Sequence, residues 1–67
     1  MMQITVNGQP HELETSLSVL ELTQRLQLDP RQLAIERNRA IVPRSLYCEV
    51  RLEAGDAIEI VHFIGGG

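Results

Sequence analysis

Apolar and polar residues alternate at the start of the chain. Met2, Ile4 and Val6 are apolar, and the residues between them are polar. Successive side chains of a strand point to opposite faces, so this period of two predicts a strand with one buried face and one exposed face.

A turn and a returning strand are expected next. Asn7-Gly8 is a dipeptide that accepts the positive φ angles of a two-residue hairpin turn. Residues 9–14 should then run antiparallel to the first strand. Pro10 has no amide hydrogen to donate to a neighbour, so we expect this second strand at an edge of the sheet.

One helix is predicted after the hairpin. Ser18 and Glu21 have the spacing of a capping box, in which each side chain accepts a hydrogen bond from a free amide at the helix start. Apolar residues recur at i, i+3 and i+7 counted from Val19, which gives one apolar stripe. Pro30 disfavours helical geometry in the residue before it. The pattern predicts a helix over residues 19–28.

The second half of the chain is less regular. Residues 33–36 predict a third strand, and Asn38-Arg39 predicts a turn because asparagine tolerates left-handed geometry. Residues 40–42 form a short extended segment. Residues 44–52 fit either a short helical turn or an irregular strand. The apolar anchors expected in that stretch are Leu46, Val50 and Leu52.

The last predicted strand, residues 57–64, is the most apolar segment. Ile58 and Ile60 point to one face, and Val61 and Phe63 point to the other. Apolar residues on both faces indicate a central strand, or a strand whose outer face contacts a partner.

The order of these elements predicts an α+β fold with one main helix across one face of a mixed sheet. The first and last strands should lie side by side and parallel in the middle, which is the β-grasp arrangement. We expect residues 1–64 to form this domain and residues 65–67 to form a flexible C-terminal glycine tail.

Composition narrows the class of function. The 67 residues are 43% hydrophobic and 22% charged, with a formal charge of −3. A core this small leaves little room for a substrate pocket of roughly 300–1,000 Å³. The acidic balance argues against nucleic acid, and no apolar run is long enough to cross a membrane. We therefore expect a carrier or binding module that acts with partner enzymes, rather than an enzyme.

Cysteine usage points to a reducing compartment. Cys48 is the only cysteine, so it can form neither an internal disulfide nor a cysteine-based metal site. We expect a cytoplasmic protein without a bound metal.

Glycine occupies the three positions after the last strand, Gly65, Gly66 and Gly67. Three extended residues add about 10 Å of reach, and glycines can enter a narrow tunnel that a β-carbon would block. A carboxylate is a poor acyl donor until it is activated, for example as an acyl-adenylate, which sulfur could then attack to give a thiocarboxylate. The pattern points to the Gly67 carboxylate as the reacting group, with a frayed terminus as the alternative.

Several segments, in this order and spacing, carry a family resemblance. They are Ile4-Thr5-Val6-Asn7-Gly8, Ala34-Ile35-Glu36-Arg37-Asn38, Ile41-Val42-Pro43-Arg44, Leu52-Glu53-Ala54-Gly55-Asp56, Ile58-Glu59-Ile60-Val61 and Gly66-Gly67. On these segments the chain resembles the ThiS sulfur carrier proteins of thiamin biosynthesis, which are ubiquitin-like β-grasp proteins. The resemblance covers essentially the whole chain.

The resemblance implies a mechanism shared among several proteins. A ThiF-like adenylyltransferase would use ATP to adenylate the Gly67 carboxylate, and sulfur from a cysteine desulfurase or another donor would convert it to a thiocarboxylate. Thiazole synthase would then take the sulfur into the thiazole ring. The chain itself would bind no cofactor and would be a monomer when free. Gly65 and Gly66 would belong to the flexible tail. The apolar partner-binding surface at the root of the tail would comprise Val61, Phe63 and Ile64.

Three other functions share some of these features. The small subunit of molybdopterin synthase would use the same thiocarboxylate with a pterin acceptor, but the Ile41-Val42-Pro43-Arg44 segment favours the thiamin carriers. A ubiquitin-like modifier is compatible with the glycine tail, but no other feature of the sequence indicates one. A plain interaction domain would not need the glycines at all.

Other reactive side chains have simpler interpretations. His11 and His62 fit exposed strand positions, and Cys48 fits a small apolar residue better than a sulfur relay. Four acidic residues could steer a basic partner, although a solvated face is the default interpretation. These are Glu49, Glu53, Asp56 and Glu59.

Overall fold

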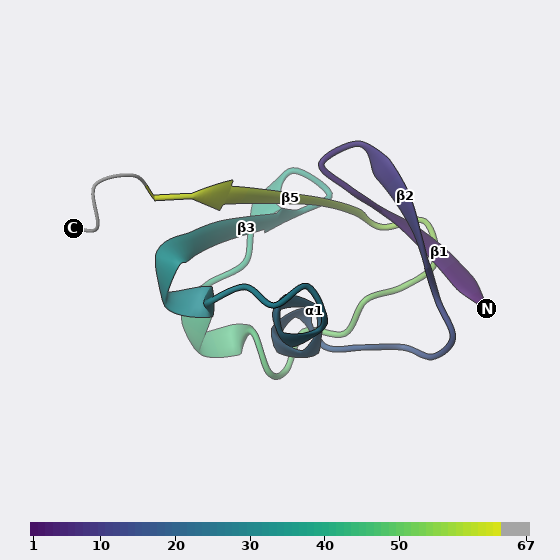
Figure 1. The fold of residues 1–67 in the computed structure, drawn as a ribbon, viewed down its shortest axis with the longest axis horizontal. Helices are drawn as coiled ribbons and strands as arrows, with labels where there is room; N and C mark the ends of the chain where they lie inside the picture. The colour runs from purple at the N-terminus through teal and green to yellow at the C-terminus, as the bar shows by residue number, and fades with distance from the viewer. Residues whose placement is uncertain (64–67) are drawn as a thin grey trace.

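The computed structural model describes residues 1–63, which form a mixed five-stranded sheet with one α-helix on one side (Figure 1). The sheet order is β2-β1-β5-β3-β4, with β1 and β5 parallel and the other neighbours antiparallel. This confirms the β-grasp prediction, with the second strand at an edge. The strands are β1 (Met2–Val6), β2 (Gln9–Leu13), β3 (Leu33–Arg37), β4 (Ala40–Ile41) and β5 (Ala57–His62).

Two hairpins have tight two-residue turns, as expected. Asn7 and Gly8 connect β1 to β2 with φ angles of 50° and 82°. Asn38 and Arg39 connect β3 to β4 with φ angles of 52° and 70°. Positive φ at both central residues matches the right-handed twist of the flanking strands.

Helix α1 (Val19–Arg25) begins where the sequence predicts and ends earlier. The Ser18 hydroxyl accepts from the Glu21 amide at 3.0 Å, and the Glu21 carboxylate accepts from the Ser18 amide at 2.8 Å, which confirms the capping box. The predicted end at residue 28 is wrong, because Gln27 adopts a φ of 59°. The Leu28 amide then donates to the Thr23 carbonyl at 2.9 Å, which closes the helix end before Pro30 is reached.

The stretch that the sequence left open is irregular with a short 3₁₀ turn, η2 (Arg44–Leu46). Its anchor is Tyr47, which is 3% exposed, together with Leu52. The expectation for Leu46 was wrong, since its side chain is 39% exposed. The Tyr47 carbonyl accepts from the Leu20 amide at 2.8 Å, so this stretch satisfies free amides at the start of α1.

The core lies between the sheet and α1, and it is made of side chains from one face of the sheet, the helix and the connecting segments. Its buried hydrophobic residues are Ile4, Val6, Leu13, Leu17, Val19, Leu22, Leu33, Ile35, Val42, Tyr47, Leu52, Ile58 and Ile60. In Figure 1, α1 and the 3₁₀ turns η1 (Pro30–Gln32) and η2 lie on the same side of β3 and β5. Among the described residues, no helix covers the opposite face of these strands, which we call the open face.

None of the helices in the described part of the chain is long and apolar enough to cross a membrane.

Candidate functional site

The end of β5 carries the two exposed apolar residues that the sequence assigned to partner binding. Ile58 and Ile60 are buried, whereas Val61 is 58% exposed and Phe63 is 54% exposed. The alternation of faces is therefore as predicted. Apart from Met1 and Leu46, the large hydrophobic side chains exposed within residues 1–63 are Ile41, Val61 and Phe63.

The other members of the predicted site, Ile64 and the glycines Gly65, Gly66 and Gly67, lie outside the described residues. Their roles, and those of Val61 and Phe63 in partner binding, stay predictions.

Polar contacts hold the last part of β5 from both sides. The Asn7 Oδ1 accepts from the Ile60 amide at 2.8 Å, and the Asn7 Nδ2 donates to the Ile60 carbonyl at 3.3 Å. On the other side, the Phe63 amide donates to the Gln32 carbonyl at 2.9 Å. Backbone pairing of β1 with β5 extends only to Ile58, so Asn7 continues the contact through its side chain. These contacts hold the chain as far as Phe63, two residues before the predicted tail.

A buried carboxylate holds the first part of β5. Asp56 is 6% exposed, and its carboxylate accepts from the Arg37 Nε at 2.8 Å, the Asn38 Nδ2 at 3.1 Å and the Glu53 amide at 2.8 Å. Burial alone would raise the pKa of Asp56, but these hydrogen bonds and the Arg37 charge outweigh it, and the pKa is lowered. Asn38 also accepts from the Ala57 amide at 2.9 Å.

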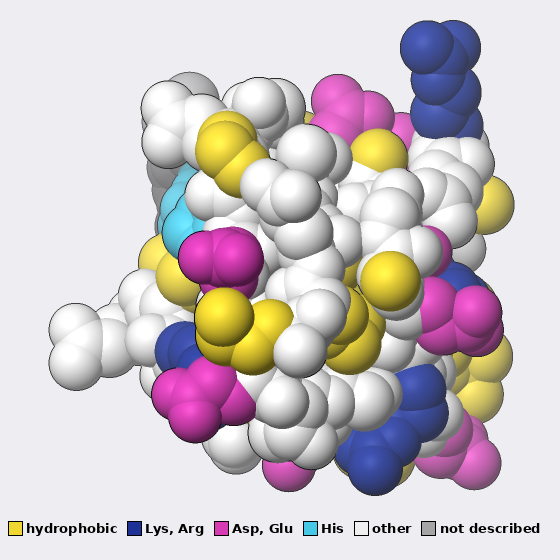
Figure 2. Space-filling model, turned by 90° about the vertical axis from the view of Figure 1, so that its right-hand side faces the viewer, with side chains coloured by type: hydrophobic (Ala, Val, Ile, Leu, Met, Phe, Trp, Pro, Cys, Tyr) yellow, Lys and Arg dark blue, Asp and Glu magenta, His cyan; other side chains and the backbone are white. Residues whose placement is uncertain are grey.

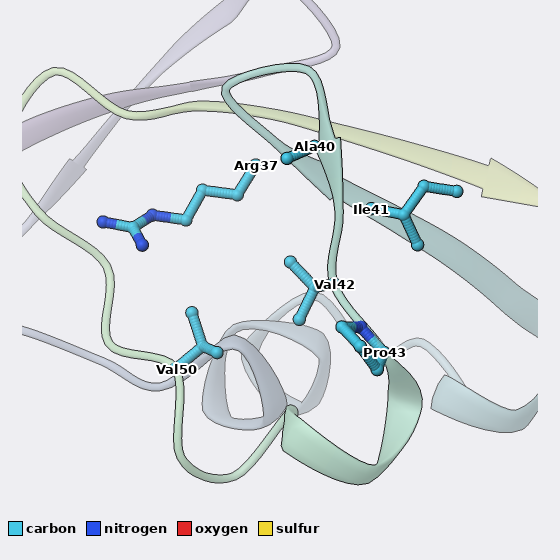
Figure 3. A pocket seen from close by; sticks show the side chains of 6 residues that line it. All are labelled: Arg37, Ala40, Ile41, Val42, Pro43 and Val50. Atoms are coloured by element: carbon cyan, nitrogen blue, oxygen red, sulfur yellow. The ribbon is translucent and has the colours of Figure 1, made fainter.

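Two shallow hollows lie beside β4. One hollow has a volume of about 190 Å³ and is lined by Arg37, Ala40, Ile41, Val42, Pro43 and Val50. Figure 3 shows the Arg37 side chain extending away from Ile41 and Pro43. The other, of about 180 Å³, is lined mainly by apolar side chains and includes Phe63 and Arg44. Both are smaller than the roughly 300–1,000 Å³ of typical ligand pockets.

The remaining reactive side chains do not converge. Residues 1–63 contain no cluster of three or more potential metal ligands. His62 is exposed at the end of β5, and His11 is half-buried on the edge strand β2. Cys48 is exposed, so the expectation of a packed apolar side chain was wrong. The exposed turn between η2 and Val50 holds it outside the core, while the adjacent Tyr47 is buried.

The four acidic residues considered for partner steering do not form one group. Arg37 pairs with two of them, Glu53 at 3.3 Å and Asp56 at 2.8 Å. Glu59 lies instead directly opposite Glu36 on β3. The sequence interpretation missed Glu36 because it considered acidic residues along the chain and not across the sheet. The alternation in residues 33–36 already placed Glu36 on the face opposite to Ile35.

The end of the molecule nearest the N terminus has a mixed surface. Figure 2 shows hydrophobic side chains there interspersed with acidic, basic and other polar groups. Isolated apolar side chains of this kind are normal on a protein surface.

Comparisons with known proteins agree with the fold and with each other. Residues 4–67 match the ThiS family. The chain is 46% identical over 66 residues to a thiazole synthase of Magnetococcus marinus, covering 98% of this chain and 20% of that protein. It therefore spans about a fifth of the length of that relative.

Two further relatives have the size of a single domain. The chain is 42% identical over 50 residues to the sulfur carrier protein ThiS of Bacillus subtilis, covering 75% of this chain and 76% of that protein. The crystal structure of the thiamine biosynthesis protein ThiS from Geobacter metallireducens superposes with a TM-score of 0.85 at 33% identity. That match covers 98% of this chain and all of the other. On the family match, the sequence relatives and the shared structure, the chain belongs to the ThiS family.

Proposed function

We propose that this chain is the sulfur carrier of a thiazole-forming step in thiamin biosynthesis. The observation that carries the proposal is the position of Val61 and Phe63. Both are exposed. Val61 is near the end of a central strand that is held on both sides, Phe63 follows that strand, and Ile64 separates Phe63 from the final glycines in the sequence. A partner enzyme can recognise such a rigid apolar root while the glycines enter its active site.

The proposed chemistry takes place at the Gly67 carboxylate. A carboxylate oxygen attacks the α-phosphate of ATP, and pyrophosphate leaves. Hydrosulfide would displace AMP from the acyl-adenylate and leave a thiocarboxylate directly. Where the sulfur arrives as a persulfide, its outer sulfur displaces AMP to give an acyl disulfide, and a second thiol then cleaves the S–S bond, which leaves the thiocarboxylate on the chain and a disulfide on the donor side. A ThiF-like adenylyltransferase supplies the first step, and a cysteine desulfurase or another donor supplies the sulfur.

The proposed enzyme that uses the thiocarboxylate is thiazole synthase, which transfers the sulfur into the thiazole ring. Relatives named thiazole synthase contain a segment similar to this chain within a longer polypeptide, and a single-domain relative is named a sulfur carrier. These names favour thiazole over pterin as the acceptor.

The proposal is tested in a reconstituted reaction with ATP, a sulfur donor, the adenylyltransferase, and thiazole synthase with its other substrates, the two enzymes coming from the same source. Three changes are compared: deletion of Gly66 and Gly67, an alanine added after Gly67, and a control alanine inserted after the exposed Met1. We expect pyrophosphate release and thiazole formation to fall about a hundredfold or more for the two tail changes, because the carboxylate is removed or displaced. The control should behave as the wild type.

The unfolding midpoint of each variant is measured in parallel, and we expect it to be unchanged because the core lies within residues 1–63. Thiazole formation at the wild-type rate by the shortened chain would refute the carrier function.

A further inference from the structure

Two carboxylates lie side by side on the open face. Glu36 of β3 and Glu59 of β5 are directly opposite in the antiparallel register. Their chain neighbours Ile35, Ile58 and Ile60 are buried in the core, so both glutamates point to the other face. Like charges in directly opposite positions destabilise a sheet. The fold therefore retains a local repulsion in its middle strands.

Neither glutamate takes part in an ion pair within residues 1–63. The ion pairs there join Arg31 to Asp29, Arg51 to Glu21, and Arg37 to Glu53 and Asp56. Arg37 follows Glu36 in β3, but its guanidinium is used by Asp56 on the side of the sheet that faces the core. Two adjacent carboxylates without an ion-pair partner in the same chain are unfavourable for folding, and such unfavourable features are typical of functional surfaces.

Apolar side chains surround the two carboxylates. Ile41 lies opposite Glu36 and is 68% exposed. Ala34 and Val61 lie opposite each other two residues further along the strands, and Val61 is 58% exposed. We call this surface the open-face patch, and it consists of Ala34, Glu36, Ile41, Glu59 and Val61. It continues toward the proposed tail root through Val61.

The charge of the patch selects the kind of partner. A second copy docked through the same patch would bring four carboxylates together, since a two-fold interface places each patch on itself. A partner with an arginine or lysine between apolar side chains would instead form charge-assisted hydrogen bonds with both glutamates.

We propose that the open-face patch docks thiazole synthase through a basic side chain that lies between Glu36 and Glu59. This inference rests on the proposed function. It adds a polar specificity element to the apolar tail root, and it accounts for the repulsive pair that the free chain tolerates.

The test measures binding of purified thiazole synthase from the same source by calorimetry at several salt concentrations. The variant is Glu36→Gln with Glu59→Gln, and the matched control is Glu12→Gln with Glu14→Gln, which makes the same charge change on exposed residues of β2 and the loop after it. We expect the variant to bind about tenfold weaker at low salt, with a flatter salt dependence, and the control to bind as the wild type.

A second readout separates docking from folding. The variant should unfold at a temperature roughly 2–4 °C higher than the wild type, because the repulsion is removed. Weaker binding by a more stable chain supports the proposal. Wild-type affinity in the variant overturns it and leaves the carrier function standing. If the wild-type chain does not bind thiazole synthase, both this proposal and the proposed function are overturned. If the wild-type chain uses the patch to form dimers, this proposal alone is overturned.

Discussion

Individual polar residues determine where β5 lies, and β5 carries the proposed tail. Asn7 holds Ile60, and Asp56 with Asn38 holds the turn into the strand. Asparagine and aspartate are the residues expected in turns because their short side chains bond to nearby backbone. Here the Asn7 and Asn38 side chains reach across to backbone amides of β5, far away in sequence. The hairpin turns thus also serve as fixed contacts for the central strand.

At this scale we predict that Asp56→Asn destabilises the fold. The substitution removes the charge that Arg37 and Asn38 are bonded to, and hydrogen bonds to a charged group contribute about 1.5–3 kcal/mol. The free energy of unfolding from urea titration should fall by that amount near neutral pH. The control is Asp29→Asn, because Asp29 is only half-buried and its ion-pair partner Arg31 is exposed, so the effect should be smaller.

The same variant has a predicted pH dependence. The pKa of Asp56 is lowered in the folded state, so its contribution is complete above the unfolded pKa of about 3.9 and is lost as the pH falls through the folded value. Wild-type stability should therefore decrease below about pH 4, and less steeply in Asp56→Asn. A residual slope is expected, because the pKa values of Glu21 and Asp29 are also lowered, Glu21 mainly by its bond from the Ser18 amide. Equal slopes in the two proteins would contradict this role of Asp56.

At the scale of elements, the sequence predicted correctly the helix start and the hairpin turns, which depend on interactions between neighbouring residues. The capping box at Ser18 and the turns at Asn7-Gly8 and Asn38-Arg39 form as expected, since each depends on a few neighbouring residues. The helix end was mispredicted because a left-handed Gln27 gives no composition signal, whereas Pro30 does. Residues 44–52 could not be assigned, since Tyr47 and Val50 are placed by bonds to the distant helix α1.

We predict that Gln27→Gly stabilises the end of α1. Gln27 is exposed with a φ of 59°, where a β-carbon is strained and glycine is not. After the entropy cost of glycine, the free energy of unfolding should rise by about 0.5–1 kcal/mol. The matched control is Gln24→Gly, an exposed position within α1, which should lower it by about 1 kcal/mol. If strain at the left-handed Gln27 is the cause, the two substitutions change the free energy of unfolding in opposite directions. Equal losses of stability in urea titrations would contradict this explanation.

At the scale of the whole molecule, the fold exposes apolar residues beside the last part of its central strand. β5 is central in the sheet and pairs with β1 and β3. Val61 is exposed near its end, and the exposed Phe63 follows the strand. Within residues 1–63, a single α-helix covers one face of the five strands, and the open face has no helix against it. The sequence predicted this arrangement and the alternation in β5. It did not predict the pairing of Glu36 with Glu59, because register depends on the folded sheet.

The most direct test of the central claim is the intact mass of this protein isolated from its native cells under non-reducing conditions. We predict a fraction in which one oxygen of the Gly67 carboxylate is replaced by sulfur, and this fraction should disappear when the adenylyltransferase is deleted. Fragmentation should locate the sulfur at Gly67. A chain that carries no sulfur at Gly67 while its cells make thiazole would contradict the carrier function.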